Sequence, residues 1–390
     1  MVKRKSHILP AIIFSQFSGT SLWFAGNAVI TDLQMEWGLG EHILGYVTSA
    51  VQLGFILGTL VFAYLAIADR FSPRRVFFFC SIAGAVANGA LLFVPEQFAS
   101  LVVLRFATGF FLAGIYPVGM KIAAGWYEQG LGRALGYLVG ALVLGTAFPH
   151  LIRGMGAELA WQQVLSGVSV LAVAGGVLML KLVPDGPYLA QGSPFNPRTL
   201  SIIFRSKSYR ASAFGYFGHM WELYTFWAFI PVWLLSYSAQ MTMELDVSLW
   251  AFFIIAIGAA GCVVGGTLSA RFGSARVAGF QLSVSGLCCL LSPLFFTASP
   301  VVFIAFLIVW GISVIGDSPQ FSALNAVNAP KEYVGSALTI ANCIGFFITV
   351  ISIQLVNTVY HVIGPQYIFW LLIPGPVLGV LALRPLLADR

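Results

Sequence analysis

The chain has 390 residues, of which 59% are hydrophobic and only 9% charged, and its mean hydropathy is +0.90. A water-soluble protein of this length could not keep so much apolar surface from water, so the composition indicates an integral membrane protein. The net charge of +6 does not indicate a nucleic-acid partner, because every Lys and Arg except Arg105 and Arg153 lies at or near a loop on one predicted side of the membrane.

Twelve apolar runs are long enough to cross ~30 Å of hydrocarbon, which takes about 20 helical residues. The first run follows the basic segment Val2–Lys5 and has no small-residue cleavage pattern, so we expect it to be retained. The even count and the basic loops place both termini in the cytoplasm, and we predict an all-α protein of the bacterial inner (plasma) membrane. The predicted spans are residues 8–33, 43–67, 76–94, 98–124, 134–152, 160–182, 211–237, 247–270, 277–297, 300–328, 335–359 and 366–387.

A short charged turn joins the second and third predicted spans. It holds four charged residues, Asp69, Arg70, Arg74 and Arg75, and its three arginines predict that it lies in the cytoplasm. The segment 270–272 (Ala-Arg-Phe) follows the second span of the second half and is similar to 69–71 (Asp-Arg-Phe). This echo predicts a duplicated unit of six spans.

A second echo supports the duplication. Ala113–Pro117 in the fourth span is similar to Ile315–Pro319 in the tenth, and each is followed by a short polar turn that contains an acid. We predict two six-helix bundles, residues 1–182 and 211–390, joined by a cytoplasmic linker at 183–210. Within the linker, Leu200–Phe204 beside several cations is compatible with a short helix at the membrane surface or with a plain linker.

These features together resemble the major facilitator superfamily over the whole chain. The charged turn resembles the family motif Gly-x-x-x-Asp-Arg-x-Gly-Arg-Arg, but Leu65 replaces the first glycine and Ser72-Pro73 replace the second. Arg105–Gly109 resembles the family's Arg-x-x-x-Gly motif in the fourth span. Ala113–Lys121 looks similar to the branch of nitrate and small-anion porters, although the nitrate signature is absent from the fifth and eleventh spans.

The resemblance implies two bundles that rock about a central site, which opens to each side in turn. It also implies that Asp69 faces the start of the eleventh span, near Val334, when the cytoplasmic side is closed. Because a helix N-terminus favours a carboxylate, we predict that Asp69 stabilises the outward-facing state, with Arg70, Arg74 and Arg75 in the same latch. Ala270 cannot make the reciprocal contact to the start of the fifth span.

Ionised side chains within spans are costly in hydrocarbon and therefore suggest a function. Arg105 is expected to hold an anion or to partner a carboxylate during proton coupling, and the alternative is an arginine that snorkels to the interface. Asp317 is the better proton carrier, because removal from water favours the uncharged carboxyl, and the alternative is a structural hydrogen bond. His219 and Glu222 share one face of the seventh span and are predicted to join in proton coupling, not in a metal site.

Polar and aromatic residues in the first, fourth, seventh and tenth spans are candidates for the solute cavity. In the family that the chain resembles, spans 1, 4 and 7 line the cavity, and a Trp or Tyr there offers an apolar wall and one donor. The candidates are Gln16, Trp23, Asn27, Tyr116, Trp221, Tyr224, Trp227, Gln320 and Asn325.

We therefore predict a monomeric secondary transporter in membrane lipid that couples a small, anionic solute to protons and needs no cofactor. The alternative is a proton-driven exporter of amphipathic compounds, which the 14% aromatic content favours and the missing Gly-Pro-x-x-Gly-Gly run in the fifth span disfavours. The alternative of another class is a membrane enzyme or receptor scaffold. No nucleophile–base pair, metal set or large soluble domain in the sequence favours it, and the five cysteines show neither metal nor disulfide spacing.

Overall fold

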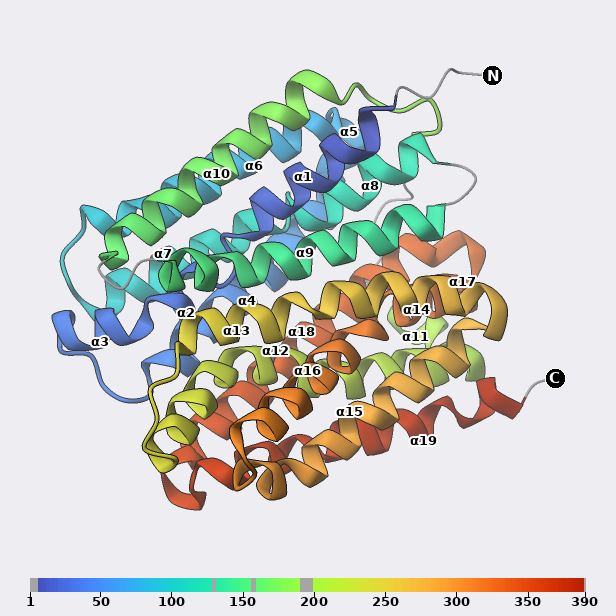
Figure 1. The fold of residues 1–390 in the computed structure, drawn as a ribbon. Coiled ribbons are helices and arrows are strands. Elements are labelled where there is room, and N and C mark those ends of the chain that lie inside the picture. The colour runs from blue at the N-terminus through green and yellow to red at the C-terminus, as the bar shows by residue number, and fades with distance from the viewer. Residues whose placement is uncertain (1–5, 128–130, 156–158, 190–198, 389–390) are drawn as a thin grey trace. The chain divides into compact units, whose positions relative to one another are not determined.

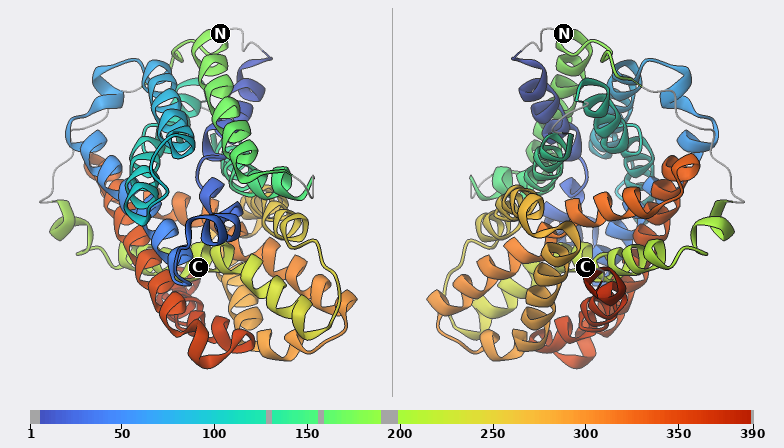
Figure 2. Two further views of the ribbon diagram at one scale, coloured as in Figure 1. Left: turned by 90° about the vertical axis from the view of Figure 1, so that its left-hand side faces the viewer. Right: turned by 90° about the vertical axis from the view of Figure 1, so that its right-hand side faces the viewer.

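The computed structural model describes residues 6–127, 131–155, 159–189 and 199–388. Every regular element in these ranges is helical, which confirms the all-α prediction (Figure 1). The chain divides into two compact units, Met1–Phe195 and Asn196–Arg390, which we call the N-unit and the C-unit. Within each unit the long helices lie side by side (Figure 2).

The N-unit holds the first six predicted spans. Several of them consist of two or three helices separated by short breaks, so there are more helices than spans. The elements are α1 (Ile8–Thr20), α2 (Ala25–Ala28), α3 (Ile30–Trp37), α4 (Ile43–Tyr64), α5 (Ile67–Arg70), α6 (Pro73–Gly89), η1 (Ala90–Leu92), α7 (Phe98–Leu112), α8 (Tyr116–Trp126), α9 (Leu131–Gly154) and α10 (Trp161–Leu182).

The C-unit holds the other six predicted spans. Its longest helix, α12, has 34 residues and is the seventh span. The elements are α11 (Thr199–Ile203), α12 (Lys207–Gln240), α13 (Val247–Ala256), α14 (Gly258–Phe272), α15 (Ser274–Phe296), α16 (Pro300–Gly316), α17 (Ser318–Asn328), η2 (Lys331–Tyr333), α18 (Val334–Ile363), η3 (Pro365–Leu372) and α19 (Pro374–Ala388).

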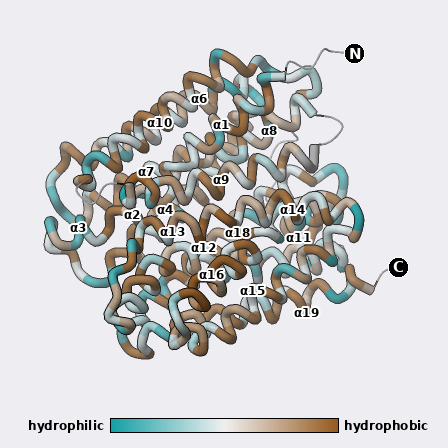
Figure 3. The backbone as a smooth tube through the Cα atoms, viewed as in Figure 1, coloured by the Kyte–Doolittle hydropathy of each residue, from teal (hydrophilic) through white to brown (hydrophobic). Residues whose placement is uncertain are grey.

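Ten of the twelve predicted spans are helical stretches long and apolar enough to cross a membrane. The first and seventh spans do not meet that criterion. The first is interrupted after Thr20, and the seventh, α12, carries buried polar residues that include His219 and Glu222. Figure 3 shows apolar residues along most helices, with hydrophilic residues gathered at many of the turns. The two exceptions occupy corresponding positions in the two units.

Helix packing shows the internal duplication residue by residue. In the N-unit, a Cβ at Gly109 would collide with the carbonyl of Val51, so α7 and α4 approach at backbone contact. In the C-unit, Gly311 makes the same approach to the carbonyl of Ile254. A second equivalent pair joins the same helices: Gly58 against the carbonyl of Phe110, and Gly261 against that of Ile312. Each of these N-unit residues lies 202 or 203 positions before its C-unit counterpart, so the same helix contacts occur in both units.

The fourth and tenth spans break at the same place. The N-unit break separates Leu112 from Tyr116, and the C-unit break lies at Asp317. Each break precedes a proline, Pro117 or Pro319, which lacks the N–H that a continuous helix needs and fits the first turn of a new one. The similarity of the two segments predicted their equivalence, but the continuous spans predicted at 98–124 and 300–328 did not include the breaks.

The segments before and after residues 190–198 each belong structurally to their own unit. In the N-unit, the Trp126 indole donates to the Pro184 carbonyl at 2.9 Å, and Ser72 donates to Asp185 at 2.9 Å. In the C-unit, α11 is the short helix that was one of the two alternatives for the linker, and its Leu200 is exposed. The cytoplasmic location of 183–210 remains a prediction.

Candidate functional site

The contact between His219 and Asp317 lies in the interior of the C-unit. Asp317 stands at the break between α16 and α17, and His219 comes from the middle of α12. His219 Nδ1 lies 2.7 Å from Asp317 Oδ1, and neither side chain is more than 1% exposed. The rings of Tyr216 and Phe321 flank the imidazole at 6.1 and 5.9 Å. The geometry is an ion pair when His219 is protonated and Asp317 is ionised.

None of the polar side-chain atoms of the pair, His219 Nδ1 and Nε2 and Asp317 Oδ1 and Oδ2, has a hydrogen-bond partner among the described residues, so the 2.7 Å contact is electrostatic. A buried carboxylate is stable when donors surround it and costly when they do not. The pair is therefore held by its mutual electrostatic contact and not by hydrogen bonds.

Glu222 lies one turn along α12 and has a different environment. Its Oε1 accepts from the Trp310 indole at 2.7 Å and from the Cys289 thiol at 3.3 Å, and its Oε2 accepts from Ser285 at 2.8 Å. The side chain is 1% exposed, and no basic side chain among the described residues pairs with it. Three donors hold both oxygens, so Glu222 is fixed in place.

Arg105 lies in the interior of the N-unit, on α7, and is fully buried. Its Nη2 donates to the carbonyls of Leu22 and Trp23 at 2.9 and 2.6 Å, and its Nη1 donates to Asn88 at 2.9 Å. These carbonyls belong to the break between α1 and α2, where the helix leaves them without intrahelical partners. Arg105 therefore clamps the break in the first span, and no acid in the described ranges pairs with it.

The sites of Arg105 and Glu222 occupy equivalent places in the two units. Gly145 packs on Thr20 and Gly345 on Met220, which sets an offset of 200 residues between the first and seventh spans. Glu222 is thus the counterpart of Leu22. The partners correspond in the same way: Ser285 to Gly84, Cys289 to Asn88, and Leu307 to Arg105. One pocket of the repeated fold holds a cation in the N-unit and an anion in the C-unit.

The predicted cavity residues of the N-unit form one group around the first span. The Trp23 and Tyr116 rings meet edge to face at 6.4 Å, and the Trp23 indole lies 3.3 Å from Gln52 Oε1. Asn27 donates to Thr48 at 2.7 Å. Gln16 is buried against Gly119, and neither of its amide atoms has a partner in the described part of the chain. The sequence did not single out Gln52 and Thr48, because it does not show which way a single polar side chain in an apolar run points.

The predicted cavity residues of the C-unit separate into different places. Tyr224 and Trp227 lie together on α12, with ring centroids 5.3 Å apart. Trp221 instead donates to the Leu371 carbonyl of η3 at 3.0 Å, so the structure does not bring it to them. Gln320 lies beside Gly265 of α14, and Asn325 is buried farther along α17. Of these predicted residues, Tyr224 and Trp227 form a contiguous aromatic surface and the others do not join it.

The charged turn has partners within the N-unit that the sequence did not predict. Asp69 forms an ion pair with Lys121 of α8, and Arg74 lies 3.9 Å from Asp185. Arg70 and Arg75 are exposed. The predicted contact of Asp69 with the start of the eleventh span joins two units and remains a prediction.

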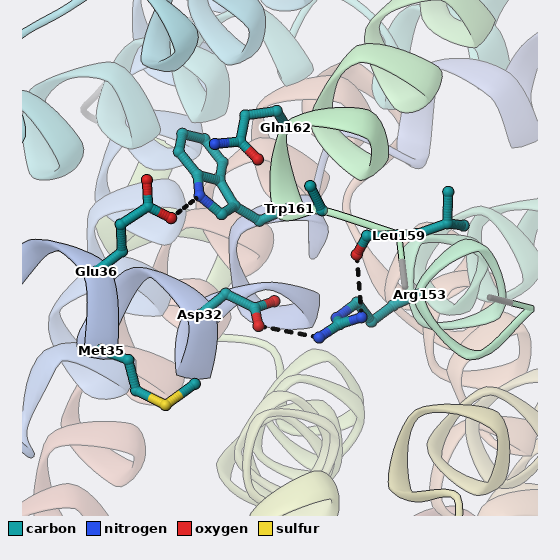
Figure 4. Close-up of a pocket in the computed structure, with 8 residues that line it drawn as sticks. Asp32, Met35, Glu36, Arg153, Leu159, Trp161 and Gln162 are labelled. Atoms are coloured by element: carbon teal, nitrogen blue, oxygen red, sulfur yellow. Dashed lines mark hydrogen bonds and ion pairs between the residues drawn. The ribbon is translucent and has the colours of Figure 1, made fainter. Parts of the chain in front are cut away.

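A surface pocket of ~590 Å³ lies at the ends of α3, α9 and α10 (Figure 4). Within it, Arg153 Nη2 lies 2.9 Å from Asp32, and the Trp161 indole donates to Glu36 at 2.6 Å. The sequence did not predict this pocket. Its polar groups largely satisfy one another, so it stabilises the end of the bundle.

Residues 11–353 match the Major Facilitator Superfamily. The chain is similar to the putative niacin/nicotinamide transporter NiaP of Bacillus subtilis, with 27% identity over 41% of this chain and 39% of the relative. It is 23% identical to the probable galactarate/D-glucarate transporter GudP of Escherichia coli, over 47% of this chain and 43% of the relative. It is 26% identical to the E. coli 3-(3-hydroxy-phenyl)propionate transporter, over 58% of this chain and 54% of the relative. These matches span about half or less of each relative.

Two solved structures share the fold over nearly the whole chain. The proton:xylose symporter XylE has a TM-score of 0.74 at 13% identity, covering 96% of this chain and 95% of its own. A mutant of the nucleoside transporter NupG has a TM-score of 0.73 at 14% identity, covering 97% and 99%. Family, relatives and fold are those of transporters and not of enzymes, as predicted. The chain is an integral membrane protein and belongs to the major facilitator superfamily.

Proposed function

We propose that the protein is a secondary transporter that moves a small organic anion across the inner membrane by alternating access, coupled to protons. The observation that carries proton coupling is the buried His219–Asp317 contact at a helix break. The names of the relatives support an anionic solute, because niacin, glucarate and hydroxyphenylpropionate carry carboxylates at neutral pH, although the first relative is also named for nicotinamide, which is uncharged. The monomeric state and the cytoplasmic termini belong to the same proposal.

In this mechanism Asp317 binds the proton, and its contact with His219 weakens as a result. With Asp317 ionised and His219 protonated, the pair holds α12 against the break of the tenth span. Protonation of Asp317 removes one charge of the pair and weakens the contact, so α17 can shift relative to α12. The break at Asp317 supplies the freedom for that shift, because no continuous hydrogen-bond ladder crosses it.

In the N-unit, Arg105 acts as a positioning residue. It ties the carbonyls of Leu22 and Trp23 to Asn88 and so fixes the broken first span. This orientation holds Trp23 beside Tyr116 and directs Asn27 toward Thr48. The unpaired positive charge of Arg105 also makes the interior of the N-unit favourable for an anion, in accord with the proposed solute class.

The aromatic content does not favour export of amphipathic compounds. Much of it packs within the core of the C-unit, where Trp233 contacts Phe296, Phe303 and Phe369, with ring centroids 5.0 to 5.2 Å apart. These rings are buried in the bundle and contribute packing energy.

Uptake into proteoliposomes tests the proposal. Labelled nicotinate, D-glucarate and 3-(3-hydroxyphenyl)propionate are supplied with and without an acidic outer buffer. We expect the gradient to drive accumulation of at least one of them, and Asp317→Asn to remove the accumulation. Glu332→Gln, an exposed acid of the same unit, is the control and should behave as wild type. Equal solute accumulation with and without the pH gradient would contradict proton coupling.

A further inference from the structure

The helix break at Asp317 has a second polar neighbour, Gln281. Gln281 of α15 packs directly on Gly316, the residue before Asp317, and a Cβ at Gly316 would collide with Gln281 Oε1. Gly316 therefore makes room for this amide at the break in the tenth span. The other titratable groups around Asp317 are His219, Glu222 and Cys262.

The amides of Gln281 and Gln320 leave polar atoms unsatisfied near the helix break at Asp317. Gln281 Oε1, Gln320 Oε1 and Asp317 Oδ2 are buried and have no hydrogen-bond partner in the described ranges. Such atoms in folded proteins are nearly always bonded, and ordered water is the usual partner when protein groups are not. The N-unit carries Cys80 and Ile115 at the positions of Gln281 and Asp317, so the repeat does not reproduce this polar cluster there.

The cluster continues toward the end of the C-unit where α14 turns into α15. A Cβ at Gly265 of α14 would lie 2.7 Å from Gln281 Nε2 and 3.2 Å from Gln320 Nε2, so the two amides meet over this glycine. Gln281 is 9% exposed, and its Nε2 is not among the buried unsatisfied atoms. Beyond it, a methyl group added at Gly266 or Gly273 would meet no atom within 4 Å.

We propose that Gln281 and Gln320 line a hydrated route by which the Asp317 carboxyl exchanges its proton with water at the α14–α15 end of the C-unit. The inference rests on the proposed function, since it assigns the path of the same proton. Amides donate and accept hydrogen bonds without ionising, so the two side chains orient water and are positioning residues. The proton passes between Asp317 Oδ2 and that water.

The neighbouring titratable groups do not offer this path. Glu222 is held by three donors, and the Cys262 thiol lies 3.5 Å from the Ile315 carbonyl, to which it donates. His219 is flanked by the rings of Tyr216 and Phe321. The exit toward bulk water at this end is therefore through the amides.

Hydrogen–deuterium exchange of the protonated Asp317 carboxyl tests the route without any solute. Infrared spectra of the full-length protein in liposomes are recorded after a switch from water to D₂O, and the band that Asp317→Asn removes identifies the carboxyl. We expect Gln281→Leu and Gly265→Ala to slow its exchange about tenfold, because one loses the amide and the other places a methyl group between the amides. Gly266→Ala adds the same methyl group to an open position and should exchange as wild type.

The outcomes separate the route from the proposed function. A spectrum in which Asp317→Asn removes no band over the accessible pH range contradicts the protonation of Asp317 and the proposed function with it. A band that exchanges as fast in Gln281→Leu and Gly265→Ala as in wild type, or one that Gly266→Ala slows equally, overturns only the route.

A second measurement is independent of protonation: with the native cysteines replaced, Gln320→Cys should react with a water-soluble thiosulfonate about tenfold faster than Phe321→Cys. Equal rates would overturn the route.

Discussion

The N-unit and the C-unit each bury one ionisable side chain in an equivalent pocket, and the two side chains are of opposite charge type. Arg105 and Glu222 lie in equivalent pockets between the first, third and fourth spans of their units, and both are buried. The two Nη atoms of the cation donate to backbone carbonyls that the break in the first span releases and to Asn88. The anion is satisfied by the side chains of Ser285, Cys289 and Trp310.

The difference has a physical origin in the helix backbone. A buried cation needs acceptors, and a helix break offers carbonyls in mid-membrane. A buried anion needs donors, but the N–H groups of a continuous helix are already bonded, so side chains must supply them. The sign of the buried charge therefore matches the conformation of the first span of each unit: broken around residues 21–24 and continuous in α12.

Replacing Arg105 with the residue of the other unit should have the largest effect. Arg105→Leu copies Leu307 and leaves the carbonyls of Leu22 and Trp23 without donors in hydrocarbon. We expect a loss of about 3 kcal/mol or more in the free energy of unfolding, measured by thermal unfolding in detergent. Arg105→Lys keeps a charge and should lose less. A stability equal to wild type for Arg105→Leu would break the assignment of Arg105 as the clamp.

The reverse exchange in the C-unit should cost less. Glu222→Leu copies Leu22 and leaves three donors, Ser285, Cys289 and Trp310, without their acceptor. Two of these are weak or rotatable donors, so we expect a loss of about 2 kcal/mol in the same assay. Glu222→Gln retains an acceptor oxygen and should lie between Glu222→Leu and wild type. A larger loss for Glu222→Leu than for Arg105→Leu would reverse the comparison.

The shared packing plan is tested by a matched pair of glycine substitutions. Gly109→Ala and Gly311→Ala should each lower stability by about 1–3 kcal/mol and by similar amounts, because each adds a methyl group where two helix backbones touch. Gly335→Ala adds a methyl group to an open position and serves as the control. Strongly unequal effects of the first two would show that the units are not equivalent at this crossing.

The charged turn should give the smallest effect. Asp69→Asn is expected to shift the balance of states inward by about two- to fivefold, which corresponds to ~0.3–1 kcal/mol for a carboxylate at a helix N-terminus. The measurement is cysteine accessibility from each side of the membrane. Ala270→Asp should shift the balance outward.

Lys121→Met distinguishes the observed partner of Asp69, Lys121, from the predicted one at the start of the eleventh span. If the contact with the eleventh span sets the balance, Lys121→Met should change it less than Asp69→Asn does. Equal effects of the two substitutions would assign the role to the Asp69–Lys121 ion pair within the N-unit instead.

Much of the fold could be predicted from the sequence, because the length of apolar runs and the charge of loops are set by the membrane itself. The equivalence of Ala113–Pro117 and Ile315–Pro319 was also readable from the residues. The breaks were not, because hydropathy measures how apolar a segment is and not whether its hydrogen-bond ladder is continuous. The acceptors of Arg105 were hidden for the same reason: two of them are backbone carbonyls at such a break.

The ionisable residues could be selected from the sequence but not distinguished. Glu222 and Asp317 are both carboxyls within predicted spans, so the cost of burying a charge made both of them functional candidates for the same reason. What separates them are partners that come from other helices. Glu222 accepts from Ser285 and Cys289 of α15 and from Trp310 of α16, whereas Asp317 has only the electrostatic contact with His219 of α12. Such partners depend on how the helices pack, which a single span does not encode.

The role of Asp317 as the proton carrier is tested most directly by comparing the two carboxyls of the C-unit in one assay. Accumulation driven by a pH gradient and solute exchange without a gradient are measured in proteoliposomes for Asp317→Asn and Glu222→Gln. We predict that Asp317→Asn loses accumulation and keeps part of the exchange, because its proton site is gone. Glu222→Gln should keep both, because three donors hold Glu222 in place, and this result would remove Glu222 from the proton-coupling group expected from the sequence. Loss of accumulation in Glu222→Gln together with normal accumulation in Asp317→Asn would contradict this role.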